Sequence, residues 1–457
     1  MLAHLGTNDA PTACIEGGTW TAVPRQPPVS LEQYTLTLEA VAPLENSRII
    51  AEDVMTLHMV GCSGDFSGHR PEDGVVAAMV AQVITPGSVG CANSPARQAS
   101  FLFHLGDVVY TDAKKADTDG KDQGKMYRHQ FYKPFTGYNS SIFAIAGNHD
   151  GKDAPEADQS AITHFLLNFC ATSSGISPDN TVDNRQAMMQ PYVYWRLETP
   201  FAYIIGLYAN VANGGVLDDP NGDSPVQHNW LVRQLTDVQQ RNGHNTPRKA
   251  VLLAVHYPPY SGAMNFQQRG NPLLVRTESP ENGAAEEVTT LTAAPTPEAI
   301  GVRPLATWLE EAFQASTQYP DAVFAAHAHL YQRLTSTYAD GRQIPYLIVG
   351  AGGHQPVENM WEHCDHSPGT AQTVPFPAVL PADLKLLPGQ SVEVEAFADQ
   401  STGGHFGFLR LTIVPGQPGR RVGEFFTAYP GSLTLADSFT LDMDTHQVTS
   451  PAMGTST

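Results

Sequence analysis

The sequence predicts an α/β layered fold, and two observations carry that prediction. Short apolar runs recur along the chain, and each ends in glycine or a polar cluster, as at 54–60, 101–105, 142–146, 201–207, 250–255, 322–326 and 346–349. Runs of this length are typical of strands that are buried on both faces. Apolar residues at helical spacing lie between several of them, at 75–83, 230–238 and 305–313. Strands that alternate with helices indicate layers of helix packed on sheet.

The flanking segments have a different character. An alternating stretch at 34–38 predicts an edge strand within an N-terminal segment, 1–50. Residues 51–450 are expected to form a single domain, followed by a tail at 451–457. Apolar runs at 406–413 and 439–443, with a weaker one at 424–428, have no clear helix between them and predict an antiparallel extension of a sheet. Segments near 264–303 and 354–400 are rich in Pro, Gly, Glu and Thr, and we expect them to be long loops or insertions.

Composition limits the partners. The 457 residues are 41% hydrophobic and carry a formal net charge of −20, from 26 basic and 46 acidic side chains. A surface this acidic repels a phosphate backbone, so we expect no nucleic-acid partner. No apolar run is long enough to span a bilayer, and residues 1–9 lack the features of a signal peptide. The five cysteines form no CxxC pair. We therefore expect a cytoplasmic protein, and the sequence leaves its oligomeric state open.

The polar clusters at the ends of the apolar runs carry metal-binding side chains. Carboxylate, amide oxygen and imidazole form a ligand set that suits Fe, Mn, Zn or Mg. The carboxyl ends of strands in α/β folds meet at one edge, so these side chains are expected to converge. A carboxylate in a tight Gly-Asp turn can bridge two ions roughly 3.5–4 Å apart. The candidate residues of this kind are Asp65, Asp107, Asn148, His256, His327 and His329.

The order of these motifs is more specific than any one of them. Gly-Asp, Gly-Asp-x-x-Tyr, Gly-Asn-His-Asp, Val-His and Ala-His-Ala-His follow one another between residues 64 and 329, and Gly-Ala-Gly-Gly-His ends at residue 354. This ordered set resembles the calcineurin-like metallophosphoesterases, and most closely their purple acid phosphatase branch. The resemblance implies a four-layer α/β/β/α sandwich, with two mixed sheets flanked by helices.

The resemblance also implies roles for the ligands. Asp107 would bridge two metal ions. Asp65 and His329 would hold the first ion, together with Tyr110, which stands where the purple enzymes have their Fe(III) ligand. The second ion, Fe(II), Zn or Mn, would be held by Asn148, His256 and His327.

Further departures and roles follow from the same comparison. The first motif has Ser67 where many members of the superfamily have histidine, which fits ligation by Tyr110 instead. His149 is expected to be catalytic, as an imidazolium that protonates the leaving oxygen, with Asp150 orienting it. Asn148, His149 and His354 are the expected substrate-binding residues. The nucleophile implied by the resemblance is a metal-bound hydroxide.

The expected function is hydrolysis of a small phosphate ester, most simply a phosphomonoester. A phosphodiesterase acting on a cyclic nucleotide or a lipid head group would use the same metals, so the motifs leave both activities open. A binding module that keeps the fold without catalysis is a third possibility, and the complete ligand set argues against it.

Overall fold

The computed structural model describes most of the chain. The described residues are 27–65, 71–84, 99–110, 123–151, 162–209, 226–244, 247–261, 305–355, 357–358, 386–399, 402–416 and 420–450. Every structural statement below concerns these ranges.

Helices in these ranges are mostly short. The α-helices are α1 (Leu38–Val41), α2 (Pro43–Glu52), α3 (Pro71–Ile84), α4 (Gln123–Tyr127), α5 (Ile162–Phe169), α6 (Val226–Asn242) and α9 (Leu305–Ser316). Single turns of other helix types lie at Glu32–Tyr34, Arg128–Tyr132 and Pro134–Gly137. None of the helices in the described ranges has the length and apolar character needed to cross a bilayer.

The strands form two mixed sheets. They are β1 (Thr35–Thr37), β2 (Met55–Val60), β3 (Phe101–His104), β4 (Ser141–Ala144), β5 (Trp195–Glu198), β6 (Ala202–Gly206), β7 (Ala250–Ala254), β8 (Ala322–Ala325), β9 (Tyr331–Thr337), β10 (Gln343–Val349), β11 (Ser391–Ala398), β12 (Phe406–Val414), β13 (Arg420–Tyr429), β14 (Thr434–Asp442) and β15 (Gln447–Thr449). One sheet has the order β1-β5-β6-β7-β8-β10-β9-β11, and the other has the order β15-β14-β13-β12-β2-β3-β4.

Parallel strands form one end of the seven-stranded sheet and the middle of the eight-stranded sheet. β2, β3 and β4 are parallel neighbours, with Leu57 opposite Phe101 and Leu102 opposite Ile142. β6, β7, β8 and β10 are parallel neighbours in the other sheet. The remaining pairs are antiparallel, except that the edge strand β1 is parallel to β5, and β12 joins the C-terminal hairpins to β2. Both sheets therefore present a row of parallel carboxyl ends.

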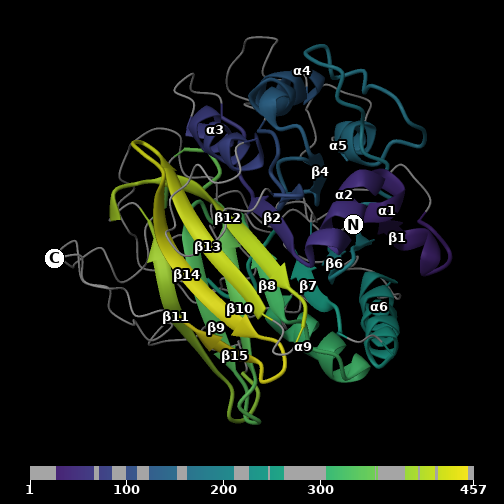
Figure 1. Cartoon of the computed structure of the whole chain (residues 1–457), viewed down its shortest axis with the longest axis vertical. Coiled ribbons are helices and arrows are strands. Elements are labelled where there is room, and N and C mark those ends of the chain that lie inside the picture. The colour runs from purple at the N-terminus through teal and green to yellow at the C-terminus, as the bar shows by residue number, and fades with distance from the viewer. Residues whose placement is uncertain are drawn as a thin grey trace, which may run out of the picture.

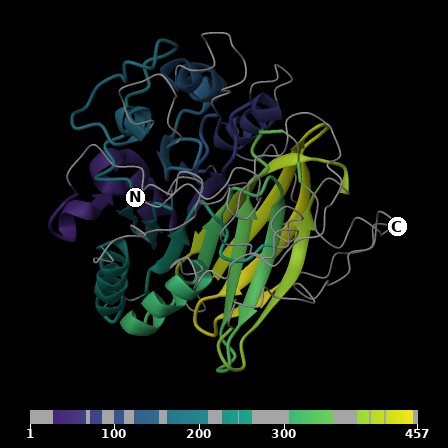
Figure 2. The ribbon, with the colours of Figure 1, turned by 180° about the vertical axis from the view of Figure 1, so that it is seen from behind.

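The two sheets stack face to face between layers of helix. In Figure 1 the yellow strands β12–β14 lie in front of the green strands β8–β10, and in Figure 2 the order is reversed. Alternate residues face the two sides of each strand. Leu57 and Met59 of one sheet and Ile204 and Leu252 of the other belong to the core between the sheets. The opposite faces lie under helices, with α3 on β12 and β13 and with α6 and α9 packed together beside the eight-stranded sheet. The expected four-layer α/β/β/α sandwich is confirmed.

The strand predictions hold where both faces of the strand are apolar. The runs ending near residues 60, 105, 146, 207, 255, 326 and 349 are all strands, and the alternating stretch at 34–38 contains the edge strand β1. The sequence prediction missed β5 and β9. It also placed β11 in an expected loop, 354–400, and α2 crosses the expected boundary at residue 50. The expected insertion at 264–303 and the tail at 451–457 lie outside the described residues.

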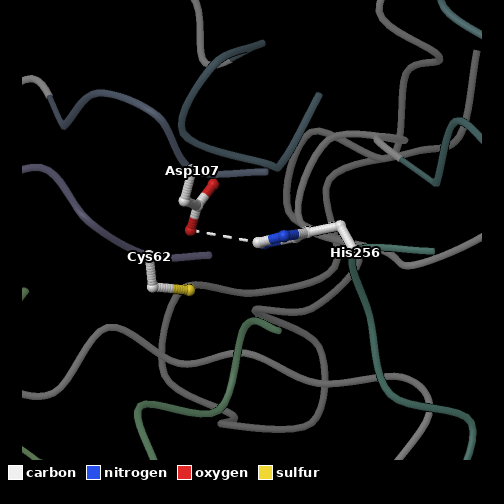
Figure 3. Close-up of side chains that lie close together, drawn as sticks. All are labelled: Cys62, Asp107 and His256. Carbon is white, nitrogen blue, oxygen red and sulfur yellow. Dashed lines mark ion pairs between the residues drawn. The ribbon is translucent and has the colours of Figure 1, made fainter. Parts of the chain in front are cut away.

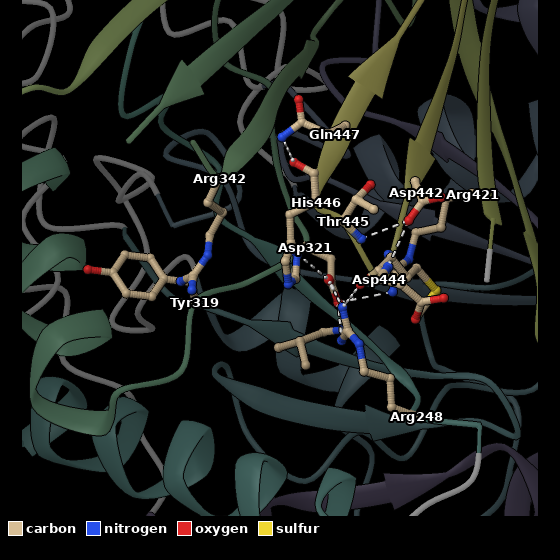
Figure 4. Close-up of polar contacts among 12 residues, drawn as sticks. Arg248, Tyr319, Asp321, Arg342, Arg421, Asp442, Asp444, Thr445, His446 and Gln447 are labelled. Carbon is tan, nitrogen blue, oxygen red and sulfur yellow. Dashed lines mark hydrogen bonds and ion pairs between the residues drawn. The ribbon is translucent and has the colours of Figure 1, made fainter. Parts of the chain in front are cut away.

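A buried carboxylate ties the two sheets together at the amino end of β8. Asp321 is 2% exposed and accepts hydrogen bonds from Arg248, at 2.6 Å and 3.1 Å, and from Arg421 of β13, at 3.0 Å. The backbone nitrogen of Val251 in β7 donates to the same carboxylate at 2.7 Å. His446, which follows β14, lies 3.8 Å away (Figure 4). Burial acts to raise the pKa of Asp321, but the two guanidinium groups outweigh it and hold the pKa below its ordinary value.

We predict that Asp321→Asn lowers the free energy of unfolding by about 3–5 kcal/mol, because it leaves the buried guanidinium of Arg421 and the partly exposed one of Arg248 without their counter-charge. Since the folded-state pKa of Asp321 is lowered, its contribution is present above the ordinary aspartate pKa and is lost as the pH falls through the folded-state value. Urea denaturation of the two proteins at neutral pH and below about pH 4 measures both effects.

Asp340→Asn is the matched control, because the side chain of Asp340 is 61% exposed. It should change stability by less than about 0.5 kcal/mol. Equal free energies of unfolding for wild type and Asp321→Asn at neutral pH would show that the cluster does not stabilise the packing of the two sheets.

Candidate metal centre

The expected site residues lie where the parallel strands of both sheets end. They follow five strands by a few residues, so side chains that are far apart in the sequence gather at one edge of the sandwich. Asp107 and Tyr110 follow β3, Asn148, His149 and Asp150 follow β4, His256 follows β7, His327 and His329 follow β8, and His354 follows β10.

Glycines allow the two sheets to approach closely at this edge. The backbone nitrogen of Gly61, after β2, donates to the carbonyl of Val349 in β10 at 2.9 Å. Gly352 donates in return to the carbonyl of Gly61 at 3.1 Å. A Cβ on Gly352 would overlap that carbonyl oxygen, and a Cβ on Gly61 would overlap the side chain of Ala326. Side chains larger than hydrogen would therefore separate the two rows of strand ends.

One half of the site gathers around the side-chain oxygen of Asn148. Nε2 of His256 lies 3.1 Å from this oxygen, and Nδ1 of His327 lies 3.0 Å from it. The same Nε2 lies 3.3 Å from Oδ2 of Asp107. All four residues are buried. These are the side chains expected to hold the second ion, with the expected bridging carboxylate beside them.

The hydrogen bonds of His256 show which of its ring nitrogens carries a proton. Its Nδ1 lies 2.8 Å from the carbonyl oxygen of Leu105, which can only accept, so Nδ1 carries a proton. In a neutral ring, Nε2 then presents a lone pair toward the oxygens of Asp107 and Asn148. Three lone pairs at this distance require either an additional proton or a cation. Burial acts to lower the pKa of His256, but the Asp107 carboxylate and the Leu105 carbonyl outweigh it and raise the pKa.

The other half of the site gathers around Tyr110. Its hydroxyl donates to Oδ2 of Asp107 at 3.1 Å and lies 3.2 Å from Nε2 of His329. The ring of His354 stacks on the ring of Tyr110, with centroids 3.5 Å apart. Nδ1 of His354 lies 2.8 Å from the carbonyl of Gly64, which fixes the ring's orientation. Asp107 therefore contacts both halves, as a bridging ligand must.

Cys62 is a site residue that the sequence analysis missed. Its sulfur, an oxygen of Asp107 and a ring nitrogen of His256 all lie within 4.8 Å of one another, and all three side chains are buried. Figure 3 shows them pointing toward a common space. Within the described ranges, no other set of three or more His, Cys, Asp or Glu side chains is grouped as tightly. Asp65, expected at this position, is not part of the group and is half-buried.

A signal for Cys62 was present in the chain. β2 ends at Val60 and is followed by Gly61-Cys62, just as the β3 run is followed by Gly106-Asp107. Position relative to the strand end therefore indicates Cys62. Motif matching indicated Asp65 instead, because Gly64-Asp65 has the expected Gly-Asp sequence.

Three of the six non-glycine residues with positive φ in the described ranges lie at the same place. Cys62, Asp107 and His327 have φ angles of 53°, 52° and 63°, in the left-handed region that residues with a side chain rarely adopt. Each such residue costs about 1–3 kcal/mol unless its surroundings impose the conformation. Three strained residues on three different strands, each directing a side chain into one cluster, are typical of a functional site.

Asp150 holds the loops of the site rather than lying in the ligand cluster. Its carboxylate accepts hydrogen bonds from the backbone nitrogens of Val108 and Val109, at 3.0–3.2 Å, and from that of Gly147 at 2.8 Å. Burial and the nearby charge of Asp107 raise the pKa of Asp150 to about 7. The backbone nitrogen of His149 donates to Oδ1 of Asp107 at 2.8 Å. The expected orienting of the His149 ring by Asp150 stays a prediction.

Comparison with known proteins adds little to this geometry. Neither the family models nor the curated proteins compared with the chain give a match. Among solved structures, the chain is similar to GAP50, the anchor in the inner membrane complex of Plasmodium, at 9% identity and a TM-score of 0.40. The match covers 85% of this chain and 88% of that one. A likeness this weak carries no argument about fold or activity.

We predict that Gly147→Ala disturbs the site without removing any candidate ligand. The new Cβ would overlap both the carboxylate and the backbone nitrogen of Asp107, so the bridge must move. Overpacking of this kind costs about 1–3 kcal/mol of folding stability. Denaturation in the presence of a chelator measures this cost independently of bound metal. Gly175→Ala is the control, since a Cβ there meets nothing within 4 Å, and equal stabilities of the two variants would contradict the packing described.

Proposed function

We propose that this protein is a two-metal phosphoesterase, most simply a phosphomonoesterase. The proposal rests on the close approach of acceptor atoms of Asp107, Asn148 and His256, which are all buried. Asp107, Asn148 and His256 direct acceptor atoms toward one another at 3.1–3.3 Å, while the other nitrogen of His256 is committed to a carbonyl. Acceptors buried together in this way are stabilised by an additional proton or by a cation, and we propose that a metal ion is that cation.

The chemistry of the donor set fits two metal ions. Asn148, His256 and His327 would hold one ion, and Tyr110 and His329 would help to hold the other, with Asp107 between them. Imidazole, carboxylate, amide oxygen and phenolate suit iron, zinc or manganese. We accordingly propose iron paired with iron, zinc or manganese. When bound, two such cations neutralise phosphate charge and activate water.

Residues around the ions would bind and orient the substrate. The Nδ2 group of Asn148 is buried and has no hydrogen-bond partner among the described residues, so it can donate to a phosphate oxygen. His149 is 9% exposed, and its ring centroid lies 4.3 Å from that of Tyr110. Its backbone is anchored to Asp107. We propose that the His149 ring, as an imidazolium, donates a proton to the leaving oxygen, and that His354, stacked on Tyr110, lines the same space.

We predict that Asp107→Asn lowers the metal content and abolishes hydrolysis of p-nitrophenyl phosphate, because the bridging oxygen loses its negative charge. Elemental analysis and turnover of the monoester and of its bis-ester measure the effect, and the ratio of the two wild-type rates separates a monoesterase from a diesterase. The surface variant Asp340→Asn should leave both metal content and turnover unchanged. Full metal content with a near-normal rate in Asp107→Asn would contradict the proposed function.

We predict that His149→Ala retains metal but lowers kcat by roughly 10²–10⁴-fold for substrates with poor leaving groups. Activated aryl esters should lose less, since their leaving oxygen needs little protonation. Rates on p-nitrophenyl and alkyl phosphates test this difference, with the exposed His244→Ala as control. An equal loss on both substrates would assign His149 to charge stabilisation instead of proton donation.

A further inference from the structure

We propose that Cys62 is a thiolate ligand of the first metal ion, and that its sulfur makes the centre select zinc or iron over manganese or magnesium. This inference rests on the proposed function, because it concerns the same two ions. It replaces Asp65, the residue expected from the sequence motif, with a residue of different chemistry.

The placement of Cys62 matches that of the bridging carboxylate on the neighbouring strand. Each follows a glycine at the end of a parallel strand, and the φ angles of Cys62 and Asp107 are 53° and 52°. The backbone nitrogen of Cys62 donates to the carbonyl of Gly106 at 3.0 Å, so the two turns lie side by side. The backbone therefore aims the two side chains in the same way.

The atoms around the sulfur belong to both halves of the centre. The sulfur, an Asp107 oxygen and a His256 nitrogen lie within 4.8 Å of one another (Figure 3). Burial and the nearby Asp107 and Cys62 side chains raise the pKa of the Tyr110 hydroxyl, which donates to Asp107. The backbone nitrogen of His327 donates to the sulfur at 3.2 Å. Backbone donors of this kind commonly tune metal-bound sulfur.

Cys170 shows how a structural cysteine differs. Both cysteines are buried and each belongs to an apolar cluster, but the thiol of Cys170 donates to the carbonyl of Tyr192 at 3.6 Å and packs with Phe165 and Phe169. Among the described residues, no set of three metal-binding side chains includes Cys170. Cys62, in contrast, has carboxylate, imidazole and phenol groups around its sulfur, an environment that a structural thiol does not need.

The consequence for metal choice follows from the softness of sulfur. Carboxylate and carbonyl oxygens suit magnesium and manganese, whereas thiolate favours zinc and iron. On binding, the metal–sulfur bond forms, the S–H bond breaks, and the proton leaves to solvent with no change in oxidation state. A carboxylate at this position, as the resemblance implies for Asp65, would give no such preference.

The test uses cobalt(II) as a spectroscopic substitute for zinc in the full-length, metal-depleted protein. Wild type should take up cobalt and show a sulfur-to-cobalt charge-transfer band in the near ultraviolet. Cys62→Ser should lose the band, while Asp65→Asn and the matched control Cys170→Ser should keep it. A band that survives in Cys62→Ser, or that disappears in Asp65→Asn or Cys170→Ser, overturns the inference.

Cys62→Asp provides a second measurement that does not depend on sulfur spectroscopy. Competition between zinc and manganese should show the wild-type preference for zinc falling by about tenfold or more in this variant, with both metals still bound. An unchanged preference overturns the inference. Two bound ions and normal hydrolysis without a thiolate band would reject only the role of Cys62, whereas a wild type that binds no cobalt would reject the proposed function as well.

Discussion

The site depends on how closely the two sheets approach at their carboxyl ends. Hydrogen bonds that join Gly61 to Val349 and to Gly352 hold the ends of β2 and β10 together, and only glycine fits at these crossings. Because of this contact, Asp107 from one sheet and His256 from the other lie within 3.3 Å. At the opposite end of β8, ion pairs of Asp321 with Arg248 and Arg421 also hold the two sheets together. Backbone hydrogen bonds therefore join the sheets at one end, and side-chain ion pairs join them at the other. The candidate centre lies at the end with the backbone hydrogen bonds.

The polar side chains beside this contact are buried, so their polar atoms must satisfy one another or bind an ion. Asp150 illustrates the solution that needs no ion, since its carboxylate is occupied by backbone nitrogens of two loops. The lone pairs of Asp107, Asn148 and His256 illustrate the other solution, because they face one another although Asp107 also accepts hydrogen bonds from the Tyr110 hydroxyl and the His149 backbone nitrogen. The contrast between these neighbouring carboxylates explains why one is proposed to hold metal and the other to hold the loops that carry it.

The sequence predicted the sandwich well where strands are covered on both faces, because continuous apolar runs then report burial directly. It failed for β5 and β9, where Arg196 and Arg333 are buried and neutralised by Asp237 and Asp437 from distant elements. Pairing across the fold cannot be read from local pattern. The gathering of the candidate residues at one edge could be predicted because they follow strand ends, and their binding of metal stays a prediction. Motif matching could not identify Cys62, because the motif has aspartate where this chain has cysteine. Only the position of Cys62, two residues after the end of β2, indicates it.

The left-handed backbone at Cys62, Asp107 and His327 has a consequence for how this chain would respond to selection for heat resistance. Glycine in any of these places would relieve about 1 kcal/mol or more of strain and would remove a candidate ligand in the same step. A thermostability screen that ignores activity would therefore tend to enrich substitutions at the centre itself. A gain at Cys62, Asp107 or His327 would measure the conformational cost of the proposed chemistry, and Asp53 and Thr317, which have positive φ away from the centre, would serve as the comparison.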